Sequence, residues 1–115
     1  QPDICHCGGF SEIRKISAMA ETFYVPVAPH NSNGPISTLA SLHLDMSIPN
    51  VFMQEIFVSF LDRYSEILTD TIAITNGVAT VPDGPGWGAE IDIDALAKYP
   101  ATDFIQIQDE PYREF

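Results

Sequence analysis

Apolar side chains recur at helical spacing in three stretches of the chain. In residues 11–23, 35–48 and 58–68 they return every three or four positions, which is typical of a helix with one buried face. Residues 92–99 add a short helix that Pro100 ends. The pattern therefore predicts helices along much of the chain.

The ends of these helices carry their own signals. Ser11 is expected to cap the first helix, Pro35 suits the first position of the second, and Pro49 stops it. The second helix is expected to turn one set of side chains inward: Ile36, Leu39, Ala40, His43 and Met46.

Shorter apolar segments alternate with the first helices. Residues 1–7, 24–28 and 51–57 are predicted as strands, although Pro26 cannot donate a hydrogen bond to a sheet. Alternation of strands and helices with short connections indicates right-handed β-α-β units and a parallel sheet.

The chain beyond residue 71 has a different pattern. Residues 72–82 alternate around Asn76-Gly77, which is a strong signal for a hairpin turn. Residues 82–88 are too rich in glycine and proline for regular structure, so they are expected to form an irregular loop.

Length and composition limit the chain to one ordinary globular domain. It has 115 residues, of which 45% are hydrophobic and 18% charged, so there is enough apolar material for a core. The apolar runs are shorter than the roughly 18 residues of a membrane helix. The Cys5-His6-Cys7 tripeptide does not suggest a secreted disulfide scaffold, so we expect a cytoplasmic protein. Because Gln1 is not an initiator methionine, we expect a processed product or a fragment.

The charge of the chain is strongly negative. Five Lys and Arg residues stand against 16 Asp and Glu, which gives a net charge of −11. Binding to nucleic acid or to an anionic membrane needs clustered basic side chains, so both kinds of partner are excluded. A salt-adapted source would explain the acidity equally well.

Three polar residues follow the predicted strands: Asp3, His30 and Glu55. Ligands of parallel sheets collect at the carboxyl ends of the strands, so these side chains are expected to converge on one pocket. A carboxylate beside an imidazole makes a general base, and a carboxylic acid kept protonated by an apolar wall can stabilise developing negative charge. Phe52, Met53, Ile56 and Phe57 are the expected wall around Glu55.

Each candidate also has a plainer interpretation. Asp3 is equally explained as a solvated residue and His30 as a surface residue, whereas a carboxylate in an apolar strand such as Glu55 is costly unless it is paired or functional. Asn31 and Asn33 are candidates for binding substrate hydroxyls. Four zinc ligands usually stand at wider spacing than in Cys5-His6-Cys7, and His43 and Trp87 are expected to serve packing.

Several segments together resemble a known family, the enolase superfamily. The closest likeness is to the C-terminal part of its mandelate racemase branch, and in particular to sugar-acid dehydratases of galactonate and gluconate type. The resemblance rests on these segments: residues 2–12, 28–31, 34–35, 48–50, 54–55 and 81–88.

The resemblance implies roles for the candidate residues. It makes Asp3 and His30 the acid/base pair that acts on the proton α to a carboxylate, and Glu55 the group that hydrogen-bonds the resulting enediolate. It also implies a Mg²⁺ ion, whose ligands in such enzymes lie on earlier strands. No metal ligand is therefore expected in this chain, and the chain alone is expected to be inactive.

The expected fold class is α/β, the C-terminal portion of a (β/α)₈ TIM-type barrel with about its sixth to eighth strands. Residues 1–71 would form the partial barrel, and residues 72–115 would return as hairpin, loop and short helix toward a capping domain. A closed barrel takes about 250 residues, so the expected partners are the missing N-terminal barrel half or another chain.

The expected function is that of a portion of a Mg²⁺-dependent aldonate dehydratase, a hydro-lyase whose parent is a homo-oligomer. Three alternatives remain open: a racemase or epimerase of the same superfamily, a non-catalytic fragment or structural subunit, and a sugar-binding module without chemistry. The sequence does not name the sugar acid.

Overall fold

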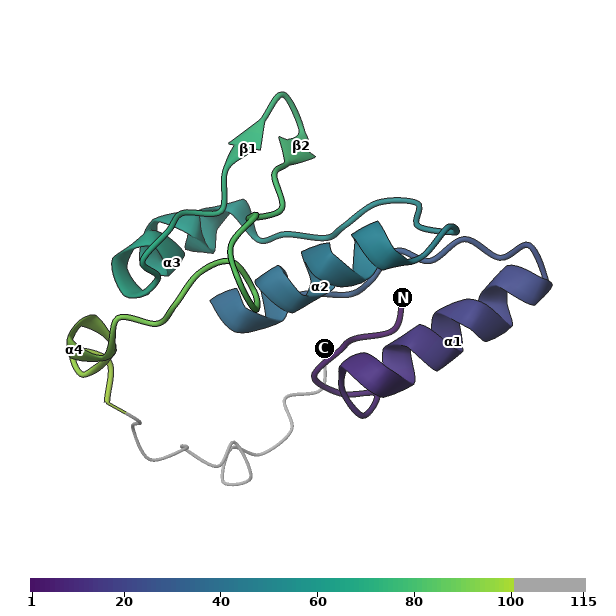
Figure 1. Ribbon diagram of the computed structural model, residues 1–115, viewed down its shortest axis with the longest axis horizontal. Helices are drawn as coiled ribbons and strands as arrows, with labels where there is room; N and C mark the ends of the chain where they lie inside the picture. Colours follow the sequence, from purple (N-terminus) through teal and green to yellow (C-terminus); the bar gives the residue numbers. More distant parts are fainter. Residues whose placement is uncertain (101–115) are drawn as a thin grey trace, which may run out of the picture.

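The computed structural model describes residues 1–100 of the chain (Figure 1). Its elements follow in this order: α1 (Phe10–Thr22), α2 (Pro35–Ser47), the 3₁₀ turn η1 (Val58–Phe60), α3 (Leu61–Ile67), β1 (Ile74–Thr75), β2 (Val78–Ala79) and α4 (Ile93–Leu96). The last part of the predicted 72–115 unit lies outside the described residues.

The three predicted strands are present only as extended segments joined by single parallel bridges. One bridge pairs Asp3 with His30 and the other pairs Val27 with Val51. The two bridges join different pairs of segments, and in the middle segment Pro26 and Pro29 have no N–H to donate to a longer ladder. The prediction of continuous strands is therefore wrong for residues 1–100, while the parallel direction of the pairing is as predicted.

Helix α1 begins one residue earlier than predicted. Its N-cap is Gly9, with φ at 87°, and Ser11 lies inside the first turn without capping it. Glycine tolerates this left-handed backbone, which turns the chain sharply from the Asp3 segment into the helix. Ile13 and Ser17 form the buried face of α1, which lies beside α2 (Figure 1).

Helix α2 lies between two apolar clusters and is buried on several sides. One cluster contains Leu39, Leu42, Tyr64, Leu68 and Ile72, and the other contains Ile4, Ile13, Ala40 and Leu44. Trp87 packs against both clusters. The prediction that Met46 faces inward is wrong, because its side chain is 75% exposed at the last turn of the helix.

The predicted hairpin is present. Strands β1 and β2 pair antiparallel with Ile74 opposite Ala79, and Asn76 and Gly77 at the turn both have positive φ. The predicted helix 58–68 is divided into η1 and α3, and the predicted helix 92–99 is the shorter α4. The Asp92 carboxylate caps α4 by accepting a hydrogen bond from the backbone N–H of Ala95.

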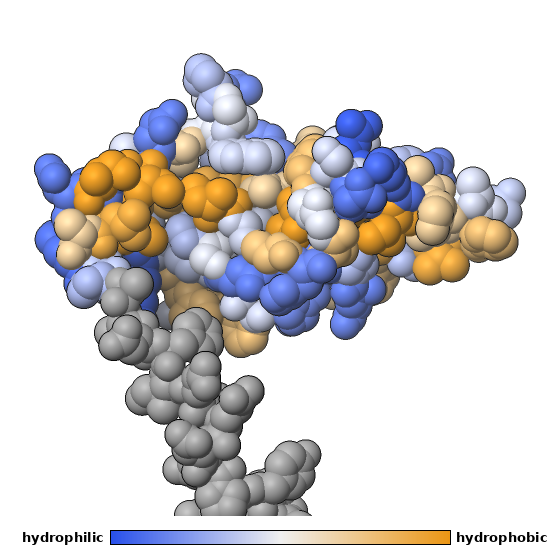
Figure 2. Space-filling model, turned by 90° about the horizontal axis from the view of Figure 1, so that it is seen from below, coloured by the Kyte–Doolittle hydropathy of each residue, from blue (hydrophilic) through white to orange (hydrophobic). Residues whose placement is uncertain are grey.

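Many large apolar side chains remain at the surface, and Figure 2 shows several such patches on one face. Phe52 is 67% exposed, and Met53 next to it is also exposed. Within residues 1–100, no helix combines the length and the apolar character needed to cross a membrane.

Candidate functional site

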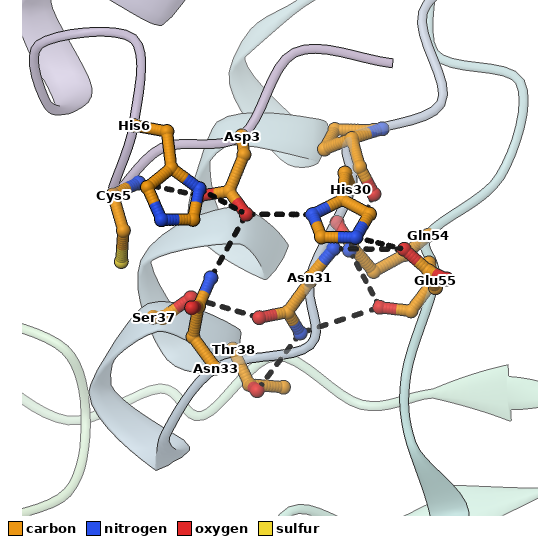
Figure 3. A network of polar contacts seen from close by, with 11 residues as sticks. Asp3, Cys5, His6, His30, Asn31, Asn33, Ser37, Thr38, Gln54 and Glu55 are labelled. Carbon is orange, nitrogen blue, oxygen red and sulfur yellow. Dashed lines mark hydrogen bonds and ion pairs between the residues drawn. The ribbon is translucent and has the colours of Figure 1, made fainter. Parts of the chain in front are cut away.

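Asp3 lies at the centre of a network of polar contacts (Figure 3). It is buried, and its carboxylate accepts hydrogen bonds from the Cys5 backbone N–H at 2.7 Å, from His30 Nδ1 at 2.7 Å and from Asn33 Nδ2 at 2.9 Å. Burial raises the pKa of Asp3, yet these hydrogen bonds and the nearby His6 ring outweigh it and hold the pKa at about 2. Asp3 is therefore an ionised acceptor at neutral pH.

His30 is held by its Nδ1 atom and open at its Nε2 atom. An ionised carboxylate can only accept hydrogen bonds, so Nδ1 carries the proton that faces Asp3. In the neutral imidazole this leaves a lone pair on Nε2, which lies 3.8 Å from Oε2 of Glu55. The side chain of His30 is 39% exposed. A ligand can thus reach the basic nitrogen while Asp3 fixes the tautomer.

Glu55 stands on the opposite side of His30 from Asp3 (Figure 3). The backbone N–H of Asn31 donates to its Oε2 atom at 2.9 Å, and its side chain is 46% exposed. The predicted apolar wall does not enclose it within residues 1–100, because Phe52, Met53 and Phe57 are themselves exposed. The carboxylate is oriented by the backbone and open to solvent.

Asn31 is turned inward rather than toward the open side of the site. Its side chain is 1% exposed and donates to the hydroxyl of Thr38 at 2.9 Å and to the carbonyl of Glu55 at 3.2 Å. Its Oδ1 accepts a hydrogen bond from Ser37 at 2.8 Å. These bonds tie the His30 segment to the start of α2 and to the Glu55 segment. The Asn31 side chain could contact a substrate only if it broke its hydrogen bonds to Ser37, Thr38 and Glu55.

Asn33 is half-buried and joins the network from the other side. Its Nδ2 donates to Asp3, and its carbonyl accepts a hydrogen bond from the hydroxyl of Tyr64. Asn33 therefore steadies the same carboxylate that holds His30, which the Asn31 side chain does not contact.

Sequence analysis missed one neighbour of this network, His6. Its Nδ1 lies 3.2 Å from Oδ2 of Asp3, and the ring is exposed rather than packed. The signal was the three-residue spacing between Asp3 and His6, which brings both side chains to one side of the turn. His43 serves packing, as expected: its Nε2 lies 3.1 Å from the carbonyl of Trp87, and the two rings are 5.6 Å apart.

The described residues do not form a metal centre. Within residues 1–100, no three or more His, Cys, Asp or Glu side chains gather in a way that could hold a metal ion. Cys5 and Cys7 are free cysteines.

A comparison of the chain with known families found one match. Residues 1–95 match the family described as enolase C-terminal domain-like. The chain belongs to this family. As an enolase-family chain it is an α/β portion of a TIM-barrel enzyme, which accounts for the parallel pairing of its extended segments.

Individual enolase-family relatives are similar over most of this chain. D-xylonate dehydratase of Haloferax volcanii is 37% identical over 95 residues, which are 83% of this chain and 23% of that protein. D-galactarolactone cycloisomerase of Agrobacterium fabrum is 35% identical, over 90% of this chain and 29% of its own length. The chain thus spans about a quarter of the length of the curated relatives that it matches.

The chain is also similar to a solved structure. An enolase of the mandelate racemase subgroup from Agrobacterium tumefaciens, crystallised with sodium and phosphate, is 43% identical with a TM-score of 0.73. The match covers 80% of this chain and 25% of that one.

Proposed function

We propose that this chain supplies the acid/base residues of a sugar-acid dehydratase. The observation that carries the proposal is the line of three side chains in which Asp3 holds His30 Nδ1 at 2.7 Å and His30 Nε2 faces Glu55 at 3.8 Å. An oriented base beside a second, solvent-open carboxylate suits removal of a proton α to a carboxylate. The dehydratases among the relatives give the substrate class, an aldonate.

In the proposed reaction His30 removes the α-proton. The Nε2 lone pair accepts the proton, and the electrons of the C–H bond pass into the carboxylate to form an enediolate. Asp3 keeps the ring in the productive tautomer and stabilises the imidazolium that forms. Asn33 supports this step by holding Asp3 in place.

Glu55 is proposed to stabilise the enediolate. When protonated it would donate a hydrogen bond to the substrate's carboxylate oxygen, where negative charge develops. The protonated His30 then returns its proton to the β-hydroxyl, which leaves as water while a carbon–carbon double bond forms. The resulting enol loses the proton of its C2 hydroxyl to solvent and takes up a proton at C3, which gives a 2-keto-3-deoxy acid, so one water is lost for each substrate.

Magnesium is part of the proposal only through the family resemblance. The described residues do not fit a metal site, so no step is assigned to a metal here. Bound by residues from outside this chain, Mg²⁺ would stabilise negative charge on the substrate's carboxylate.

The proposed architecture makes this chain the closing part of a barrel. Residues 1–71 would supply the last three strands, and residues 72–100 would return along the outside toward a capping domain. The remaining barrel would come from the same or another polypeptide in a cytoplasmic homo-oligomer. The parallel bridges that join the three extended segments support this arrangement, because the strands of such a barrel are parallel.

Two other functions are considered. The cycloisomerase among the relatives favours a reaction that shares proton abstraction but does not lose water, as a racemase or epimerase also would. A non-catalytic subunit that only completes a barrel is the other; it leaves the alignment of Asp3, His30 and Glu55 without a use.

The test is proton NMR of the assembled protein that contains this chain together with the rest of the barrel, in D₂O with Mg²⁺ and a panel of aldonates, following the C2 proton. Conversion to a 2-keto-3-deoxy acid supports the dehydratase, and C2 exchange alone supports the cycloisomerase or racemase. His30→Asn is expected to abolish exchange, while His43→Asn, the same substitution at a packing histidine, should retain it. A folded protein without exchange on any substrate would favour the non-catalytic subunit.

A further inference from the structure

A cavity of about 480 Å³ lies away from Asp3 and His30, between α2, the extended segment that ends in Glu55, and the β1–β2 hairpin. Its walls are mostly apolar, with Leu42, Met53 and Ile74 coming from the three elements in turn. Two polar side chains also line it, Asp45 on α2 and Gln54 on the extended segment.

Both polar side chains present a buried oxygen that lacks a hydrogen bond. Among residues 1–100, Asp45 Oδ1 and Gln54 Oε1 are inaccessible to solvent and have no donor. The orientation of the Gln54 amide is well determined, because its Nε2 donates to the carbonyls of Pro29 at 3.2 Å and Glu55 at 2.8 Å. Exchanging the amide nitrogen and oxygen would set an oxygen against two carbonyls.

Unpaired buried acceptors are costly, and a carboxylate is the most costly of them. Asp45 is the only titratable side chain that lines the cavity, and none of the lining residues is Lys, Arg or His. Burial raises the pKa of Asp45 to about 7. The four Lys and Arg residues within residues 1–100 (Arg14, Lys15, Arg63 and Lys98) all lie elsewhere.

The chemistry of the cavity selects one kind of occupant. A carboxylate oxygen and an amide oxygen both accept hydrogen bonds, so an occupant that pairs with both must donate more than one. A guanidinium offers five N–H groups in a planar fork, and its aliphatic stem packs well against apolar walls. The exposed apolar side chains of Met46, Phe52 and Val58 rim the opening, as expected of a surface that another segment covers.

We propose that this cavity receives an arginine side chain from the protein surface that covers this face in the assembled enzyme. The inference rests on the proposed function only in assuming that further barrel segments assemble with this chain. The arginine would pair with Asp45 and donate to Gln54, which removes both unpaired acceptors and fixes the covering segment against α2 and the hairpin.

The test uses two small probes on the 115-residue chain, N-acetyl-arginine amide and the neutral isostere N-acetyl-citrulline amide. Binding is followed by NMR through the backbone amides of residues 45 and 54, which are present in the wild type and in every variant. The arginine probe is expected to bind about tenfold more tightly than the citrulline probe, because one hydrogen bond is charge-assisted. This preference should strengthen as pH rises through about 7, where Asp45 ionises.

Matched variants separate this contact from general charge attraction. Asp45→Asn should abolish the preference for arginine, and Gln54→Leu should weaken it. Asp62→Asn, the same charge change on exposed α3, should leave it intact. Equal binding of both probes, or an arginine preference that survives Asp45→Asn, would overturn the proposal. Because no turnover is measured, this outcome is independent of whether the dehydratase assignment holds.

Discussion

The Nδ1 atom of His30 lies 2.7 Å from the Oδ2 atom of Asp3, although the two residues are 27 positions apart in the sequence. The backbone pairs the same two residues through a parallel bridge, and the N–H of His30 donates to the carbonyl of Pro2. The contact between Asp3 and His30 is therefore set by backbone pairing, so it forms without a bound ligand.

Replacing Asp3 by Asn should lower the rate of C2 proton exchange by about 10²–10⁴-fold. The amide can hold His30 in place but no longer imposes the tautomer with a free Nε2. The rate is measured by deuterium incorporation at C2 in the protein that contains this chain. The isocharge control Asp62→Asn should stay near the wild-type rate, and a wild-type rate for the Asp3 variant would refute the pairing role.

Asp3 should also make the chain sensitive to acid. Its pKa of about 2 is below the ordinary value of 3.8, so ionised Asp3 stabilises the fold above pH 4. This contribution, about 2 kcal/mol, is lost as pH falls from about 4 to about 2. Urea unfolding across this range should show a steep loss of stability in the wild type and a flatter profile in Asp3→Asn. Equal slopes would contradict the expectation.

Asp45 should change the stability of the fold with pH in the opposite direction from Asp3, and in a different pH range. Its pKa is raised from 3.8 to about 7, so the folded chain favours the protonated carboxyl and loses stability as pH rises from about 4 to 7. In the isolated chain, Asp45→Asn should therefore be more stable than wild type at pH 8, by on the order of 2 kcal/mol, since the side chain is only partly buried. Below pH 4 urea unfolding should give the same stability for wild type and Asp45→Asn. Asp62→Asn, which removes an exposed charge, is the control and should not gain this stability at pH 8.

Asn31→Ala should destabilise the chain by about 1–3 kcal/mol, because Ser37 and Thr38 lose their buried partner. The neighbouring exposed Ser32→Ala should change stability by less than about 0.5 kcal/mol. Both are measured by urea unfolding at pH 7. A neutral Asn31→Ala would mean that its inward hydrogen bonds do not support the fold.

Two glycines of the 82–88 loop allow a matched comparison. Gly86 and Gly88 have φ of 65° and 78°, so an alanine is strained at either position. A Cβ at Gly88 would also meet the Cβ of Pro82 at 2.4 Å, whereas a Cβ at Gly86 meets nothing within 4 Å. Gly88→Ala should therefore lower the thermal midpoint clearly more than Gly86→Ala, and similar midpoints would contradict this.

Local patterns in the sequence predicted the helices because each buries a stripe of apolar side chains at regular spacing, as Ile13 and Leu39 show. The hairpin was predictable for a local reason too, since Asn76-Gly77 tolerates the required backbone. The prolines at 26 and 29 interrupt a ladder that apolar content alone suggested. Strand continuity depends on hydrogen bonds between segments distant in sequence, and apolar spacing does not describe these.

The convergence of Asp3, His30 and Glu55 was predictable because parallel segments end at the same edge. The surroundings of those residues were not. Glu55 is open because the neighbouring apolar side chains point outward, and Asn31 turns inward because the first turn of α2 offers it two hydroxyls. Asp45 lies on α2, among apolar residues. The cavity that it lines could not be predicted, because its walls come from segments that are distant in sequence.

The intrinsic fluorescence of Trp87 reports on the packing of this chain. Trp87 is the only tryptophan in the sequence, and its ring packs against both apolar clusters and near Phe10 and His43. Its fluorescence therefore responds when either cluster loosens or when the 82–88 loop lifts from α2. Tyrosine emission is spread over several environments, so a comparison of the two signals would tell local detachment of that loop from cooperative melting of the chain.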